Sequence, residues 1–247
     1  MTNPNTRDEA WRYADGKVLE GLAPEAFDAW KQVDIAAGES RRHVMIVGGD
    51  APELHRIRIN VGEGGRAELF VVVAGDDYAR VEVESELASG AHLEIGGVTI
   101  GGGDAVREIV TRTQHDHPGA TSNQVVRSVH WGHATGNFLG AINVGRGGQQ
   151  TDAAQSFKAL LLEKGATANA KPELEIFADD VKCAHGAAIG QMDEMARYYM
   201  ASRGIAPDVA KKLMVRAFIA DAFAALEDED EQSRLLETAL ERLGEAL

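Results

Sequence analysis

The feature that most constrains this chain is a long stretch in which apolar residues recur at every second position between glycine-bearing corners. From about residue 43 to residue 190, segments such as RIRINV, RVEVESEL and HLEIGGVTI alternate in the manner of β-strands. Gly-Ala pairs recur along it, at Gly90, Gly119, Gly140, Gly165 and Gly186. Short strands at a period of roughly 20 to 30 residues predict a β-solenoid, in which each coil continues the core of the previous one. A β-sandwich with regular turns is the alternative.

The segments on either side of this β body have helical patterns. Residues 1–30 contain short helical stretches, with Trp11, Tyr13 and Trp30 as expected packing anchors. After residue 190, MDEMARYYMASRGI, PDVAKKLMVRAFIADAFAAL and EDEDEQSRLLETALERLGEAL repeat apolar residues at helical spacing. We therefore expect an N-terminal helical segment over residues 1–42, a β core over residues 43–190 and a C-terminal helical domain over residues 191–247.

Charge and cysteine content exclude several classes of function. The net charge of −14 disfavours binding to nucleic acid or to anionic membranes, because both need clustered Lys and Arg. The chain has no apolar run long enough to span a membrane, and its start lacks the pattern of a signal peptide. The single cysteine permits no internal disulfide, which suits the cytoplasm, and it cannot supply the four thiolates usual for an iron–sulfur cluster. No phosphate-binding loop and no HExxH, CxxC or GxSxG motif occurs.

A histidine cluster suggests one enzymatic hypothesis. His115 and His117 are two residues apart, and His130 and His133 follow shortly after them. On a strand, residues two apart point to the same side, so the first pair could share a metal ion in a cupin-like enzyme. The alternative is that the four side chains line a sheet surface and bind backbone or water. The second pair is not spaced for one strand face.

The segment around the only cysteine is the other candidate site. If residues 182–185 are extended, Cys183 and His185 project from the same face of one strand. A thiol beside an imidazole can become a thiolate that binds a soft metal or sulfur. The alternative is a buried structural cysteine beside a hydrogen-bonded histidine. A Cys–His nucleophile is disfavoured, because the two side chains would point in parallel rather than at each other.

A longer stretch around this cysteine resembles a known family. The run KPELEIFADDVKCAHGAAIGQMDEMARYYMASRGI, together with TDAAQSFKALLLEKGATANAKPELEI before it, resembles the SufB/SufD family of iron–sulfur cluster assembly proteins, and HGAAIGQMDE is closer to the SufD branch. The resemblance implies a right-handed parallel β-helix with flanking helices. It also implies a non-catalytic scaffold subunit that docks a SufC-like ABC ATPase and pairs with a SufB-like subunit.

The resemblance also assigns roles to residues. Cys183 and His185 match the cysteine and histidine that lie at the SufB–SufD interface and are implicated in building the nascent cluster. The helix from residue 207 to residue 226 is the candidate docking surface for the ATPase, with Val209, Leu213 and Phe218 as its contacts. We expect no tightly bound cofactor, only a transient iron–sulfur cluster shared with a partner chain.

The chain departs from the family in two respects. It is shorter than typical SufD proteins, mainly before the β body, and it has no second cysteine. A self-sufficient scaffold is therefore not expected, and cluster ligands would come from another chain, either a SufB-like subunit or a second copy of this one.

Overall fold

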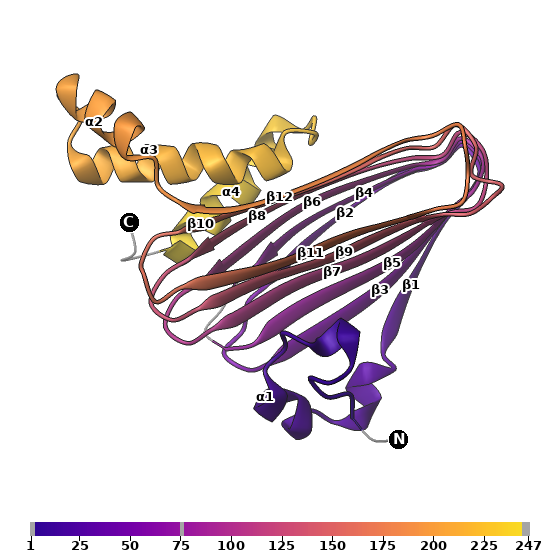
Figure 1. The fold of residues 1–247 in the computed structure, drawn as a ribbon, viewed down its shortest axis with the longest axis horizontal. Coiled ribbons are helices and arrows are strands. Elements are labelled where there is room, and N and C mark those ends of the chain that lie inside the picture. The colour runs from indigo at the N-terminus through magenta and orange to yellow at the C-terminus, as the bar shows by residue number, and fades with distance from the viewer. Residues whose placement is uncertain (1–2, 75–76, 244–247) are drawn as a thin grey trace.

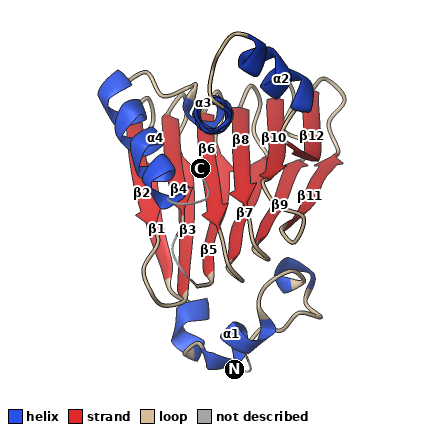
Figure 2. Ribbon diagram, turned by 90° about the vertical axis from the view of Figure 1, so that its left-hand side faces the viewer, coloured by secondary structure: helices blue, strands red, loops and turns tan. Residues whose placement is uncertain are grey.

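A computed structural model describes residues 3–74 and 77–243 of the chain. The strands within these residues form two parallel sheets that face each other (Figures 1 and 2). The first sheet contains β1 (Trp30–Ile35), β3 (Glu53–Val61), β5 (Ala79–Leu87), β7 (Val106–His115), β9 (Thr135–Val144) and β11 (Thr167–Ile176). The second contains β2 (Ser40–Val47), β4 (Arg66–Val73), β6 (His92–Gly101), β8 (Thr121–His130), β10 (Asp152–Leu161) and β12 (Lys182–Gln191).

This topology is a β-solenoid, as the sequence predicted. Successive strands alternate between the sheets, so each coil contributes one strand to each sheet and pairs in parallel with the coil before it. The number of residues per coil increases along the chain. Trp30 pairs with Arg56, 26 residues later, in an early coil, whereas Thr135 pairs with Thr167, 32 residues later, in a late coil. The β body begins at Trp30, inside the segment that we expected to be helical.

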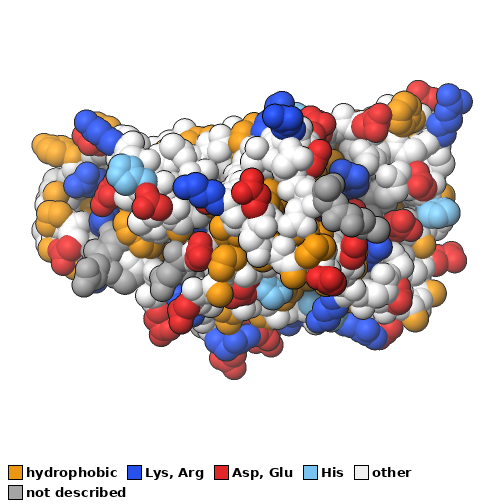
Figure 3. Space-filling model, turned by 90° about the horizontal axis from the view of Figure 1, so that it is seen from below, with side chains coloured by type: hydrophobic (Ala, Val, Ile, Leu, Met, Phe, Trp, Pro, Cys, Tyr) orange, Lys and Arg blue, Asp and Glu red, His pale blue; other side chains and the backbone are white. Residues whose placement is uncertain are grey.

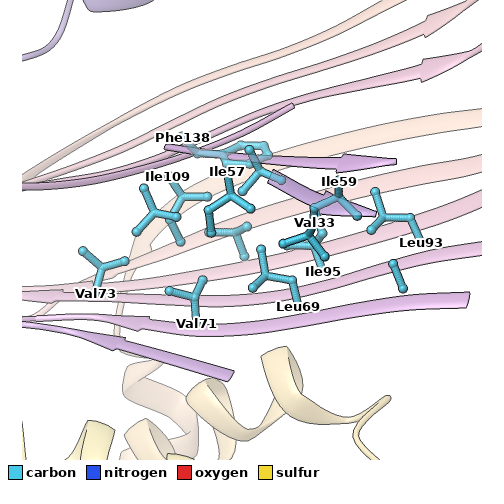
Figure 4. Close-up of a cluster of buried hydrophobic side chains, with 14 of the residues drawn as sticks. Val33, Ile57, Ile59, Leu69, Val71, Val73, Leu93, Ile95, Ile109 and Phe138 are labelled. Atoms are coloured by element: carbon cyan, nitrogen blue, oxygen red, sulfur yellow. The ribbon is translucent and has the colours of Figure 1, made fainter. Parts of the chain in front are cut away.

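Side chains that point between the two sheets form the main core. In the early coils these inner positions are aliphatic, and Ile57, Ile59, Leu69, Leu93 and Ile95 are buried against one another (Figure 4). Because strand side chains alternate between faces, the apolar positions of strands such as β3 fill the interior and the polar positions between them face outward. Each aliphatic side chain buried in this way contributes roughly 1.5–3 kcal/mol.

The corners that join odd- to even-numbered strands share one backbone conformation. Gly38, Gly64, Gly90 and Gly119 have φ between 61° and 71°, which is unfavourable for residues with a Cβ atom. Each donates its N–H to a carbonyl of the next coil, as Gly64 does to Ser89 at 2.9 Å. In the fifth coil the equivalent position is Gln150, with φ 61° and an N–H bond of 2.6 Å to the Asp180 carbonyl.

Three C-terminal helices and a short 3₁₀ turn follow the last strand. They are α2 (Glu194–Ser202), α3 (Pro207–Ala220), η3 (Asp221–Phe223) and α4 (Glu229–Leu243), and α3 and α4 lie over the outer face of the even-numbered sheet (Figure 2). Phe223, Val215 and Leu235 pack against Phe70 and Val98 of that sheet. No helix in residues 3–74 or 77–243 is long and apolar enough to cross a membrane.

The N-terminal segment packs on the outer face of the odd-numbered sheet. It contains η1 (Glu9–Trp11), α1 (Gly16–Gly21) and η2 (Pro24–Phe27). The Trp11 ring stacks on the guanidinium of buried Arg80, 3.8 Å from the ring centroid, and Arg80 pairs with buried Glu108 at 3.3 Å. Seen from the side of this segment, acidic and basic side chains are interspersed rather than gathered (Figure 3).

Candidate site at the open end of the solenoid

The last coil, β11 with β12, forms an open end of the solenoid. In the part of the chain that the structure describes, no further strand pairs with either of them. The backbone N–H of Lys182 donates to the Thr151 carbonyl of the previous coil at 2.8 Å. Successive residues of a parallel strand direct their backbone N–H and C=O groups to opposite neighbours, so those of Cys183 and His185 point toward the free edge. Their side chains occupy inner-face positions, in register with Ala153 and Gln155 of β10.

Cys183 is the second residue of β12 and lies next to the corner that joins β11 to β12. It is half-buried and packs against a cluster that includes Ile142, Val144 and Ala153. Burial, assisted by the negative charge of Asp152, raises the pKa of the Cys183 thiol above its ordinary value. The thiol is therefore protonated at neutral pH in the isolated chain, and a bound metal ion or a partner charge would be needed to favour the thiolate.

His185 is exposed and shares the inner face with Cys183. A shared face is expected for two residues that are two positions apart on a strand. Cys183 is more buried than His185 because it packs against the cluster that includes Ile142, Val144 and Ala153. In an earlier coil the next strand would cover both side chains. Here they are open to whatever approaches the end of the solenoid.

Gln155 is a third polar side chain at this end, and the sequence patterns did not single it out as a site residue. It is 2% exposed, and its Nε2 donates to the carbonyls of Gly140 at 3.3 Å and Glu173 at 3.0 Å. Its Oε1 accepts no hydrogen bond from the described residues. A polar residue at an inner-face position of a strand was the signal that could have identified it.

The rim of the open end carries exposed large apolar side chains. Ile176, Phe177 and Ile189 are 39%, 59% and 47% exposed, which is unusual for large apolar side chains beside a free sheet edge. Pro172 lies on an inner-face position of β11, where its missing N–H removes one donor from the free edge, as expected for an edge strand. The rim thus combines exposed apolar side chains with backbone groups able to pair with another strand.

The predicted ATPase-docking residues lie elsewhere, on the C-terminal helices. Val209 and Leu213 of α3 are 45% and 46% exposed. They line a groove of about 420 Å³ between α3 and α4, with Leu240 on its other side. Phe218 does not line this groove, because it packs, partly buried, against the helix–sheet core.

The four candidate histidines do not form a common site. His115 ends β7 and His117 lies in the following corner, whereas His130 ends β8 and His133 lies in the corner at its far end. The ten residues of β8 separate the pairs by about 30 Å at 3.3 Å per residue. No group of three or more metal-binding side chains is found among residues 3–74 and 77–243.

His115 and His130 instead point into the core, and both are fully buried. His115 is bonded to Ser122 Oγ at 2.9 Å, and His130 lies 3.3 Å from Thr99 Oγ1. Burial lowers the pKa of His115 to about 4, and burial together with the nearby Arg107 lowers the pKa of His130 to about 3. Both rings are therefore neutral core residues at physiological pH.

Comparisons with known proteins find a family model and relatives that match most of the chain. The family model for the SufBD core domain of SUF-system iron–sulfur cluster assembly matches residues 32–218, more than half of the chain. The chain is 29% identical over 219 residues to the iron–sulfur cluster assembly protein SufD of Escherichia coli, covering 87% of this chain and 51% of that protein.

Two further relatives match shorter parts of the chain. The chain is 31% identical over 171 residues to a SufBD family protein of Synechocystis, covering 69% of this chain and 38% of that protein. It is 42% identical over 105 residues to the chloroplastic protein ABCI7 of Arabidopsis thaliana, covering 42% of this chain and 22% of that protein. The chain thus spans about half, or less, of the length of these relatives.

Proposed function

The chain belongs to the SufB/SufD family of SUF-system iron–sulfur cluster assembly proteins, and from that premise we propose that it is a scaffold subunit with no catalytic turnover of its own. The observation that carries the proposal is the position of Cys183 and His185, side by side on the inner face of a strand with a free edge. Thiolate and imidazole are donors that iron accepts, and the cluster is the cargo of this site rather than a resident cofactor.

The partner at the open end would be a SufB-like chain or a second copy of this one. A cluster usually takes four protein ligands, and this chain offers one thiol and one imidazole at the open end, so a second chain is needed to complete the set. The free edges of β11 and β12 can pair with strands of a partner, and the exposed Ile176, Phe177 and Ile189 would be covered by it.

A SufC-like ATPase would dock in the groove between α3 and α4, with Val209 and Leu213 as its apolar contacts. The chain has no phosphate-binding loop, so nucleotide would be handled by that partner. Nucleotide-driven movement of the ATPase subunits would then open the interface at β11 and β12 and expose Cys183 and His185.

Co-purification from the native cells, with the tag on this chain, tests the assembly. The wild-type chain should recover an ABC-type ATPase and a SufB-like chain or a second copy of itself. Ile189→Arg should lose the partner at the open end and Leu213→Arg should lose the ATPase. Ile46→Arg, on the opposite terminal coil and 40% exposed, should keep both. Recovery of the wild-type chain alone would contradict the proposal.

The roles of the two site residues need a separate experiment. In cells that depend on this system, Cys183→Ala and His185→Ala should each lower the activities of iron–sulfur enzymes. Because both side chains are partly exposed, neither variant should affect folding strongly. Unchanged enzyme activities at normal protein levels would contradict a role for the site in cluster assembly.

A further inference from the structure

Arg127 is a buried cation between the C-terminal helices and the even-numbered sheet. Its side chain is 4% exposed and occupies an outer-face position of β8, beneath α3 and η3 (Figure 2). In the two preceding coils, the residues in register are Val72 and Val98, which belong to the apolar cluster between helices and sheet. A charge is costly to bury where the neighbouring coils have valine, so Arg127 calls for a reason besides packing.

The guanidinium of Arg127 joins three separate parts of the chain. Its Nε and Nη2 both donate to Oδ2 of Asp221, the C-cap residue of α3, at 2.8 and 2.6 Å. Its Nη1 donates to the Val126 carbonyl at 2.8 Å and to the Ser156 carbonyl at 3.0 Å, and Nη2 also donates to Ser156 Oγ at 3.3 Å. The five N–H donors of the arginine are thus shared among the end of α3, β8 and β10.

The strand that Arg127 holds is the neighbour of the candidate site. Ser156 of β10 is in register with Gly186 of β12, the residue that follows His185. No other strand of the described residues pairs with β12, so its position depends mainly on its hydrogen bonds to β10. A displacement of β10 at Ser156 is therefore passed to β12 beside His185.

The joint between Arg127 and Asp221 is stiff. Asp221 is 51% exposed and can be hydrated, but Arg127 without it would be a buried charge with no counter-ion. The apolar contacts of the same helix, such as those of Val215 and Ile219, are non-directional and allow small sliding movements. Movement at the C-terminal end of α3 is therefore transmitted to the sheet through the bonds of Arg127.

We propose that Arg127 is a positioning residue that couples helix α3 to the last coil. The same helix carries Val209 and Leu213, which line the groove between α3 and α4, and ends at Asp221. A movement imposed at the groove reaches β10 through Asp221 and Arg127, and it displaces β12 with the candidate site. That an ATPase supplies the movement rests on the proposed function, whereas the coupling within this chain does not.

Amide NMR of the full chain without a partner tests the coupling. Asp221→Asn removes the charge and keeps the shape, and it should shift the resonances of β12 around Gly186. In an Arg127→Met background, the same change should leave these resonances unmoved, because the joint is absent. Asp228→Asn alters another carboxylate of the C-terminal region, which faces Arg42 of the sheet at 3.9 Å, and should also leave them unmoved. Resonances of β12 that ignore Asp221→Asn, or that shift equally in both backgrounds, would overturn the coupling.

Urea unfolding separates coupling from a purely structural role. Arg127→Met places an apolar side chain where the preceding coils have valine and leaves Asp221 to solvent, so the urea midpoint should be unchanged or higher. A marked fall in the midpoint would assign Arg127 to stability instead.

Cells that depend on this system test the consequence. Arg127→Met should lower iron–sulfur enzyme activities about twofold or more while both partners still co-purify, whereas Arg58→Met, which removes an ion pair on the other sheet, should not. Normal activities, or the loss of a partner, would contradict a coupling role. Failure of the proposed function would appear instead as recovery of the wild-type chain alone, and the NMR result would stand without it.

Discussion

The two buried histidines predict a steep loss of stability in mild acid. His115 and His130 are fully buried, and burial holds their pKa values at about 4 and about 3. In the unfolded chain, a histidine has a pKa of about 6.5. Between about pH 6.5 and pH 4, the unfolded state therefore binds more protons than the native state, and the free energy of unfolding falls as the pH falls.

The size of this effect follows from the two pKa values. At pH 5 the unfolded histidine is largely protonated and the native one is largely neutral, so each ring destabilises the fold by about 2 kcal/mol relative to pH 7. The two together remove about 4 kcal/mol, a large part of the 5–15 kcal/mol typical of a folded domain. Above about pH 6.5, the contribution of both rings to stability is fully present.

Urea unfolding at pH 7 and pH 5 measures this loss. His115→Gln and His130→Gln replace each ring by a neutral polar side chain, and each should reduce the pH dependence by about 2 kcal/mol. His133→Gln changes an exposed histidine and serves as the control. If the wild-type chain and the two buried-site variants lose the same stability between pH 7 and pH 5, the reasoning is refuted, because the two rings would then not be neutral in the fold.

Three further predictions follow from other buried or strained positions. Gln150→Gly should stabilise the chain by about 0.5–1 kcal/mol, because the left-handed conformation disfavours a residue with a Cβ atom, and an unchanged urea midpoint would count against this. Glu108→Ala should destabilise by about 3–5 kcal/mol, because it removes a partner of the buried Arg80, and simple additivity with Arg80→Ala would show that the pair does not interact. Iodoacetamide should alkylate Cys183 more slowly in the native than in the unfolded chain at pH 7, with Asp152→Asn partly restoring the rate; equal native and unfolded rates would contradict the raised pKa.

Alternation predicted the β body because it reflects which side of a strand is buried. Ile57, Ile59 and Val61 share one face in the sequence and are all buried in the structure. The glycine recurrence was a less accurate guide. Gly90 and Gly119 occupy equivalent corners, whereas Gly140 and Gly186 lie within strands, so the spacing of these pairs did not reveal the true coil length.

The first strands were missed for a physical reason. In WKQVDI of β1, only Val33 and Ile35 are buried, because this terminal strand has one neighbour and a polar outer face. Such a short segment has little alternation to detect. Its pairing with β3, which is distant in sequence, determines its conformation, and no local pattern encodes that contact.

Sequence spacing located one candidate site and could not test the other. Cys183 and His185 are on one strand, where a separation of two residues fixes a shared face. The two histidine pairs are on different corners of the solenoid, where separation in space depends on the direction of β8. The buried position of Gln155 and its unpaired oxygen depend on register and hydrogen bonds, which sequence spacing does not encode.

The inner-face columns of the even-numbered sheet show how the candidate site comes to lie in the last coil. Two columns run through registered strands, from Ala67 through Leu93, Ser122 and Ala153 to Cys183, and from Leu69 through Ile95, Gln124 and Gln155 to His185. The aliphatic members of the early coils form the core, whereas Ser122, Gln124 and Gln155 of the later coils are polar and the two columns end at Cys183 and His185. Each coil is stabilised mainly by its neighbours, so the early coils can hold the fold while the last coil leaves its inner face available. A candidate ligand pair at this end therefore requires no buried charge, and the substitutions that test Cys183 and His185 should act on cluster assembly without removing the core.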